Sequence, residues 1–289
     1  MKERSLVFFT ILAQTSAGAF IIWALVYWQR LGQAGGLNVD HLVITDLLVI
    51  GLLMIASLAI SLYHLGSPSN AWRALANLSS SWLSREILFA LLFSFFLGMF
   101  TILRLFDLGH GALRAGLVAI TAMSGLALVY CMARLYMLRT VPAWNSRLTL
   151  LAFFTTTFLL GSLLIGTILT IQTIWMNFKQ ALEALVLLPW IAGICLLALL
   201  AEFILVPLNL RRMLELDVVA HLGRPLSQIY LLRMAPLVVG VALAGITFFS
   251  AAPPINIGWV IGAGLSFTLV LVSEIFGRLL FYENRLPAM

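Results

Sequence analysis

The sequence predicts an all-α, polytopic membrane protein with eight transmembrane helices, and two observations carry that prediction. Of the 289 residues, 62% are hydrophobic and only 10% are charged, whereas soluble domains are about 45–50% apolar and about 25% charged. The apolar residues also fall into eight long blocks, and a bilayer core requires about 20 apolar residues for each helical span. Together these observations exclude a water-soluble globule.

We expect the blocks to form helices within one integral membrane domain covering residues 1–289. Unpaired backbone groups are intolerable in hydrocarbon, and the blocks lack the two-residue alternation of a barrel strand. The first block is too long for the core of a signal peptide, so we interpret it as a retained span. The connections 64–86 and 207–233 are long and polar. The expected spans are approximately 5–29, 42–63, 87–105, 113–136, 149–174, 183–206, 234–250 and 258–281.

The basic residues lie mostly on one side of the expected membrane. We define face A as the side of both termini and of the connections after even-numbered spans, and face B as the opposite side. Of the 17 Lys and Arg residues, face B receives Arg30, Arg104, Arg114 and Lys179, and face A receives the others. Because cytoplasmic connections carry the excess of Lys and Arg, we expect face A to lie in the cytoplasm at a bacterial inner membrane. The net charge of +6 then reflects topology and not nucleic-acid binding, since there is no basic soluble domain.

The sequence offers few ligands for a redox centre of its own. Cys131 and Cys195 both lie within apolar blocks, and an iron–sulfur cluster needs about four thiolates, so we expect both to be buried core residues. We therefore expect neither an iron–sulfur cluster nor molybdenum in this protein. The histidines argue against a transmembrane haem, because they lie at span ends or in connections, but a haem on face A with His64 as one ligand stays open: His41, His64, His110 and His221.

Polar side chains within the expected spans crowd toward face A. Ionisable groups in a span are costly and mark functional hypotheses by default. His64 ends the second span, Glu86 opens the third, and Gln14 lies about 14 Å into the first at 1.5 Å per residue. A cavity lined by these residues would hydrogen-bond a quinone head group and exchange its protons, because His and a partly buried Glu titrate near neutral pH. The alternative is that each residue only reaches for the membrane interface.

A second set of polar residues lies near the face A ends of the later spans. Glu274 and Arg278 are four residues apart, so they share one helical face, and Glu202 lies near the end of the sixth span. We expect these residues either to handle protons or to form a structural pair. A smaller polar group lies toward face B and consists of Asp46, Arg104 and Asp107.

One short motif occurs twice. His64-Leu65-Gly66-Ser67-Pro68 ends the second span, because Gly and Pro terminate a helix sharply. His221-Leu222-Gly223-Arg224-Pro225 echoes it after the sixth span. The echo is consistent with a parallel duplication of spans 1–4 and 5–8 into two four-helix bundles, although the flanking residues do not align.

Three stretches of the sequence resemble the membrane anchor subunits of the dimethyl sulfoxide reductase family. The first contains Tyr63-His64-Leu65-Gly66-Ser67-Pro68, Ala71-Trp72-Arg73-Ala74 and Ser80-Ser81-Trp82-Leu83-Ser84-Arg85-Glu86. The others are Thr140-Val141-Pro142-Ala143-Trp144-Asn145 and Glu274-Ile275-Phe276-Gly277-Arg278-Leu279-Leu280-Phe281-Tyr282. The resemblance covers essentially the whole sequence, and the connection 64–86 is its most specific part.

This resemblance implies an anchor that holds a molybdopterin catalytic subunit and a four-cluster iron–sulfur subunit on the membrane. It also implies electron exchange with the quinone pool, so that menaquinone or ubiquinone is the substrate. The family's histidine and glutamate implicated in quinol handling match His64 and Glu86, and we expect Gln14, Ser67 and Arg85 as further quinone contacts. We expect the iron–sulfur subunit to dock on basic residues of face A through electrostatic complementarity, namely Arg73, Arg211, Arg212, Arg224 and Arg233.

The expected orientation departs from the family pattern, in which the anchors have both termini outside and serve exported catalytic subunits. The form Ser-Trp-Leu-Ser-Arg-Glu of residues 81–86 and their neighbours is closer to anchors of cytoplasmic relatives, such as sulfite dehydrogenases that reduce quinone. We therefore expect docking on the cytoplasmic face. The alternatives are an eight-helix secondary transporter, against which the apolar mid-span positions argue, and a purely structural anchor without a quinone site. In each case the isolated protein is not an enzyme.

Overall fold

A computed structural model describes residues 2–31, 40–62, 75–109, 111–176, 178–215, 226–250 and 256–283. Within these ranges the regular structure is helical, with no strand. Eight of the helices are long and apolar enough to cross a membrane by length and composition. The expected all-α class with eight spans is therefore confirmed.

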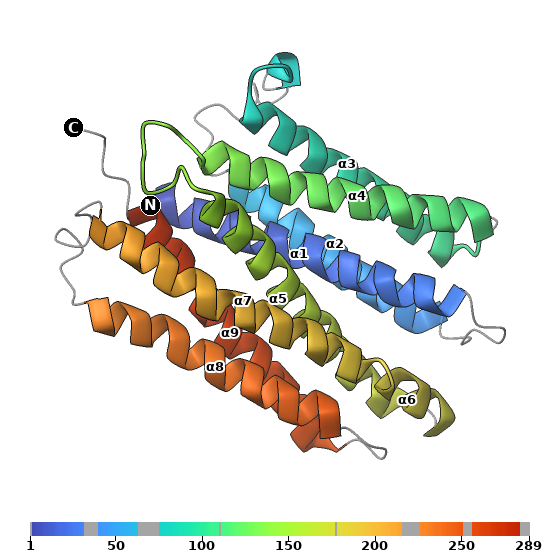
Figure 1. Cartoon of the computed structure of the whole chain (residues 1–289). Coiled ribbons are helices and arrows are strands. Elements are labelled where there is room, and N and C mark those ends of the chain that lie inside the picture. Colours follow the sequence, from blue (N-terminus) through green and yellow to red (C-terminus); the bar gives the residue numbers. More distant parts are fainter. Residues whose placement is uncertain are drawn as a thin grey trace.

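The long helices lie side by side and run back and forth along one direction (Figure 1). Both termini lie at the same end of this array, which we continue to call the face A end. The bounds are α1 Lys2–Leu31, α2 Asp40–Leu62, α3 Trp82–Leu105, α4 Gly111–Tyr136, α5 Arg147–Gln172, α6 Phe178–Leu185, α7 Leu188–Glu215, α8 Leu226–Ser250 and α9 Ile257–Glu283, with a single 3-10 turn, η2, at Thr173–Trp175.

The helices form two four-helix bundles with the same internal order. In the first bundle α1 packs on α2, α2 on α3, α3 on α4, and α4 returns to α1. In the second bundle α5, α7, α8 and α9 repeat these four contacts in the same sequence. Helices α1 and α5 join the bundles at the centre of the molecule. The arrangement confirms the two four-helix bundles and is that of a parallel internal repeat.

Two glycines let the central helices α1 and α5 approach closely. A Cβ atom on Gly161 would lie 2.5 Å from the backbone N of Ala19 and 2.7 Å from Cα of Gly18. A Cβ atom on Gly18 would in turn overlap the backbone O of Thr157. Small residues at such crossings allow the close backbone packing on which helix association in a membrane depends, since lipid supplies no hydrophobic drive between helices.

Three expected boundaries differ from the structure. Helix α3 begins at Trp82 and not at 87, because the Ser81 hydroxyl accepts a hydrogen bond from the backbone N of Ser84 at 3.3 Å and caps the helix. Helix α7 continues past Pro207 to Glu215, and α8 already begins at Leu226, so most of the expected 207–233 connection is helical. Charged side chains end an apolar block, but they do not end a helix that leaves the membrane, and the Arg211–Glu215 pair at 3.1 Å supports the last turn of α7.

Aromatic side chains fill the face A end of the joint between the bundles. The Trp144 and Phe281 rings are stacked with centroids 5.1 Å apart, and the Trp144 indole Nε1 donates to the backbone O of Phe281 at 2.7 Å. The Tyr136 ring meets the Tyr282 ring edge to face at 5.3 Å. The short segment between α4 and α5 is thereby tied to the end of α9, which positions the polar side chains described next.

Candidate functional site

In the first bundle, a buried carboxyl group lies close to the face A end. Glu86, in the second turn of α3, is 2% exposed. Within the described part of the protein, neither of its carboxyl oxygens has a hydrogen-bond partner. Tyr136 of α4 and Tyr282 of α9 lie within electrostatic range of it. His64, with which the sequence pairs Glu86, lies outside the described residues, as does Ser67.

Arg85 is turned toward the connection that precedes α3. It donates hydrogen bonds to the backbone O of Leu78 at 2.8 Å and of Ser79 at 2.6 Å. Its guanidinium carbon lies 4.3 Å from the centre of the Trp82 ring, and that of Arg134 lies 5.0 Å from the same ring. Arg85 thus holds the connection against α3 through cation–π and backbone contacts, and its expected role as a quinone contact stays a prediction.

In the second bundle, two carboxylates lie buried among α5, α7, α8 and α9. Glu202 of α7 is fully buried and forms an ion pair of 2.7 Å with Arg233 of α8, whose side chain is 16% exposed. Glu274 of α9 is 2% exposed and accepts a hydrogen bond from the Thr156 hydroxyl of α5 at 2.7 Å. The Ser273 hydroxyl donates to the backbone O of Arg233 at 2.6 Å, which holds α8 against α9. Sequence reasoning missed Thr156, because threonine is common along α5.

Gln14 links the two bundles. Its side-chain Nε2 donates to the backbone O of Phe153 at 2.9 Å, and its Oε1 accepts from Arg278 Nη2 at 2.7 Å. The Arg278 guanidinium carbon lies 3.8 Å from the centre of the Phe153 ring. Gln14 therefore contacts the second polar group, whereas the sequence associated it with His64 and Glu86.

The expected pair of Glu274 with Arg278 takes a different form. The two residues share one face of α9, as their spacing requires, but no direct ion pair joins them among the described side chains. Their hydrogen bonds go to other helices, Glu274 to Thr156 and Arg278 to Gln14. The polar side chains of α9 thus connect three helices where the sequence suggested contacts within one.

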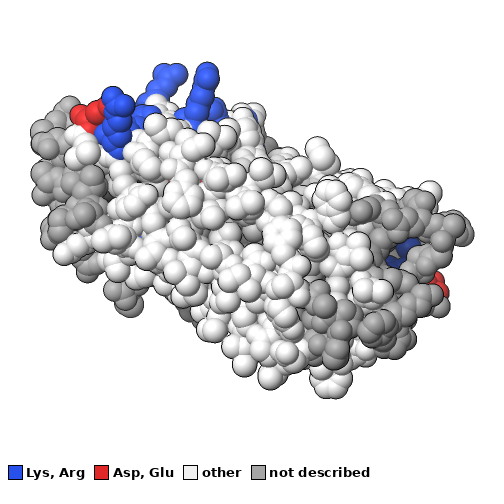
Figure 2. Space-filling view, turned by 60° about the horizontal axis from the view of Figure 1, so that its bottom comes forward, with Lys and Arg blue, Asp and Glu red and all other residues white. Residues whose placement is uncertain are grey.

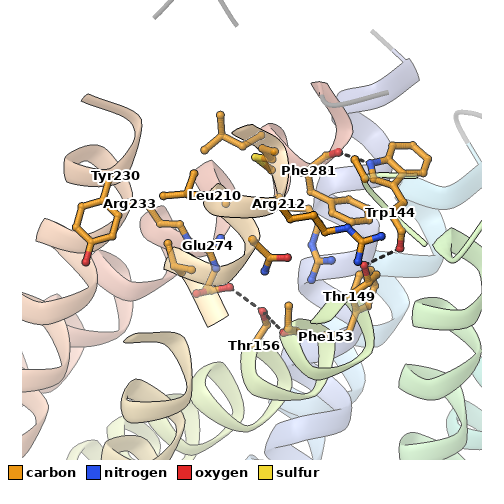
Figure 3. Close-up of a pocket in the computed structure, with 18 residues that line it drawn as sticks. Trp144, Thr149, Phe153, Thr156, Leu210, Arg212, Tyr230, Arg233, Glu274 and Phe281 are labelled. Atoms are coloured by element: carbon orange, nitrogen blue, oxygen red, sulfur yellow. Dashed lines mark hydrogen bonds between the residues drawn. The ribbon is translucent and has the colours of Figure 1, made fainter. Parts of the chain in front are cut away.

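A cavity of about 70 Å³ lies between α5, α7, α8 and α9 at the face A end. Figure 3 shows Glu274 beside Thr156, with Arg233 next to it and Trp144, Phe153 and Phe281 on the other side. Three buried polar atoms at or next to this cavity have no hydrogen-bond partner among the described residues, namely Glu274 Oε1, Glu202 Oε1 and Arg233 Nε. A buried polar atom without a partner costs free energy, so each calls for a ligand or water.

The arginines expected to dock a partner have different surroundings. Arg211 is exposed and pairs with Glu215, while Arg212 donates to the backbone O of Pro142 at 2.8 Å and of Asn145 at 2.9 Å. Arg233 lies mostly inside, paired with Glu202. Figure 2 shows basic side chains projecting at one end of the molecule and a long uncharged middle. Arg73 and Arg224 lie outside the described residues.

The face B group is divided between two separate contacts. Asp46 is buried and accepts a hydrogen bond from Gln172 Nε2 of the second bundle at 2.6 Å. Asp107 lies between α3 and α4 with its carboxylate 2.6 Å from Arg114 Nη2, and the hydrogen bond and charge of Arg114 lower the pKa of Asp107. Both cysteines are buried and free, as the sequence predicts. Across the described ranges, no three His, Cys, Asp or Glu side chains gather as metal ligands would.

Comparisons with known proteins agree along the whole sequence. The family model described as DMSO reductase anchor subunit (DmsC) matches residues 1–283. A subunit of the anaerobic dimethyl sulfoxide reductase of Haemophilus influenzae is 30% identical over 98% of this protein and 94% of its own length. The subunit of the same name from Escherichia coli is 29% identical over 97% and 94%. A subunit of the sulfite dehydrogenase of Allochromatium vinosum is 34% identical over 52% of this protein and 49% of its own length. No solved structure matches.

Proposed function

The protein belongs to the DMSO reductase anchor subunit family, and from that membership we propose that it anchors a three-subunit molybdopterin iron–sulfur oxidoreductase and passes electrons between the quinone pool and the iron–sulfur subunit. Relatives named as parts of a reductase and of a sulfite dehydrogenase support partners that carry the redox centres. The observation that carries the quinone role is Glu86, a buried carboxyl group whose two oxygens find no partner among the described residues.

The proposed site lies where α2 ends and α3 begins, at the face A end of the first bundle. A quinol that is oxidised releases two protons and two electrons, and reduction of a quinone consumes them. His64 hydrogen-bonds the head group, and Glu86 exchanges one proton with it. A buried carboxyl suits this task because it is stable in its neutral form and is charged only transiently. The electrons pass to a cluster of the docked iron–sulfur subunit.

The partner docks on face A, which we propose lies in the cytoplasm at a bacterial inner membrane. Arg211, at the end of α7, is exposed there, and Arg73 and Arg224 fall in the same set of connections by sequence. An acidic face on the iron–sulfur subunit would be complementary to these residues. Cysteine-accessibility mapping tests the orientation, since labelling of residues 64–86 from the periplasm would contradict it.

The quinone role is tested with Glu86→Gln and His64→Ala in the intact complex, purified and placed in lipid vesicles. We expect each variant to lose at least about tenfold in turnover with a short-tail quinone or quinol, because general acid–base groups contribute typically 10²–10⁴-fold. Turnover with a soluble dye that exchanges electrons with the partner subunits should be unchanged. Glu215→Gln makes the same chemical change at an exposed residue and serves as control. Equal quinone turnover in all the variants would leave a structural anchor without a quinone site.

A further inference from the structure

The cavity of the second bundle occupies the place that Glu86 occupies in the first. Glu86 lies near the start of α3, the third helix of its bundle, and Arg233 lies near the start of α8, the third helix of the other. Arg134 lies near the end of the fourth helix of the first bundle, and Glu274 and Arg278 lie near the end of the fourth helix of the second. Because both bundles repeat the same helix order and orientation, the two polar groups are equivalent positions of one repeated unit.

We propose that the cavity between α5, α7, α8 and α9 is a second binding site for a quinone head group. This inference rests on the proposed function, since it assigns a further site for the same class of substrate. The occupant's hydroxyl or carbonyl oxygens are held by Glu274 Oε1, which accepts, and by Arg233 Nε, which donates. These are the buried atoms that lack partners among the described residues.

The charges at the cavity select an uncharged ligand. Arg233 and Arg278 line it together with Glu274, and Glu202 lies against Arg233. An anion would meet the buried carboxylates, and a cation would meet the buried guanidinium groups, so either would leave a like charge close by in a low-dielectric site. A neutral ligand that both donates and accepts hydrogen bonds satisfies the atoms without adding charge.

The shape and the walls select a ring. Phe153, Phe281 and Trp144 line one side of the cavity, and flat rings pack favourably against aromatic side chains. The volume of about 70 Å³ corresponds to about five to seven water-sized probes on the scale where one needs about 10–15 Å³. That is the space of a single-ring head group and not of an extended cofactor.

The position of Arg233 depends on a glycine. A Cβ atom on Gly277 would lie 2.7 Å from Cζ and 2.9 Å from Nε of Arg233, so the absence of a side chain at this residue of α9 leaves room for the guanidinium group. Thr156 holds the opposite hydrogen-bonding group, Glu274, by its hydroxyl. Both hydrogen-bonding groups of the cavity are thus oriented by neighbours on other helices, as a ligand site requires.

The test is photolabelling of the intact complex in lipid nanodiscs with short-tail azidobenzoquinone and azidonaphthoquinone probes, followed by mass spectrometry of the labelled peptides. We expect label on residues 143–156, 206–213 or 274–281 as well as near residues 64–86, and competition at both places by the unmodified short-tail quinone. Glu274→Gln replaces a charged acceptor by a neutral one and should weaken labelling of the second bundle about tenfold. Labelling near 64–86 should not change.

A matched pair of variants separates ligand contact from loss of structure. Thr156→Val removes the hydrogen bond to Glu274, whereas Thr155→Val makes the same change next to it, where the hydroxyl bonds the backbone O of Leu151 in its own helix. The first should weaken labelling of the second bundle and the second should not. Label confined to residues 64–86, or equal labelling in both variants, overturns the second site. Absence of label near 64–86 contradicts the proposed function instead.

Discussion

The close crossing of α1 and α5 makes a sharp prediction for Gly161→Ala. The added methyl group would lie 2.7 Å from Cα of Gly18, whereas carbon atoms in good contact are about 3.5–4.0 Å apart. The two helices must therefore separate by about 1 Å at the crossing. Because these helices join the two bundles, the separation loosens the central interface of the molecule.

The expected size follows from the packing. A radial gap of about 0.5–1 Å forfeits a quarter to a half of the dispersion attraction of the atoms concerned, and overpacked cores lose typically about 1–3 kcal/mol. Alanine by itself favours a helix over glycine by about 1 kcal/mol, so the control must share that gain. Gly193→Ala in α7 is such a control, since a Cβ there meets nothing within 4 Å.

The assay uses the two native cysteines. Cys131 and Cys195 are both buried, so a thiol-reactive fluorescent dye reports unfolding of the detergent-purified protein on heating. Relative to Gly193→Ala, we expect the Tm of Gly161→Ala to fall by roughly 2–12 °C, at about 2–4 °C for each kcal/mol. Equal Tm values for the two variants would refute the reasoning that backbone contact at this crossing holds the bundles together.

Three further predictions concern single contacts. Arg233→Met leaves Glu202 buried and unpaired, and breaking such a pair costs about 3–5 kcal/mol, so its Tm in the same assay should fall well below that of the double variant Glu202→Leu with Arg233→Met; the opposite order would contradict the buried pair. Ser81→Ala removes the N-cap of α3 at a cost of about 1 kcal/mol, which hydrogen exchange should detect as weaker protection of residues 82–85, with Ser80→Ala as control. Arg114 lowers the pKa of Asp107 in the folded state, so the stabilisation from that pair is present at neutral pH and is lost as pH falls through the depressed pKa. The Tm difference between Asp107→Asn and the unchanged protein should therefore be present at pH 7 and shrink on acidification, and a difference that grows as pH falls would reverse the sign.

The sequence was a sufficient guide to the membrane architecture, because burial in lipid is a property of each segment by itself. Any block of about 20 apolar residues must satisfy its own backbone as a helix, so eight spans follow from composition and length. Helix ends were predicted less well at α3 and α7. A polar residue marks where the apolar block stops, but the helix continues wherever a cap or an ion pair sustains it, as Ser81 and the Arg211–Glu215 pair do.

The site was partly visible in the sequence. Glu86, Glu202, Glu274 and Arg278 stand out because an ionisable group in a span is costly, and the structure finds each of them buried. Their partners were beyond reach of the sequence. Spacing along α9 suggested a Glu274–Arg278 pair, yet the hydrogen-bond partners of these two residues lie on α5 and α1 and are set by how the bundles meet.

Composition and order of residues therefore determined that this protein is a helical membrane anchor with its polar groups near one face, because hydrophobicity and charge act segment by segment. Tertiary structure alone decided which polar groups share a cavity. Gln14 and Arg278 are separated by 264 residues, yet they share a hydrogen bond of 2.7 Å, because Gly18 and Gly161 let α1 and α5 approach. Contacts of this kind depend on the packing of whole helices against one another, which no local pattern in the sequence records.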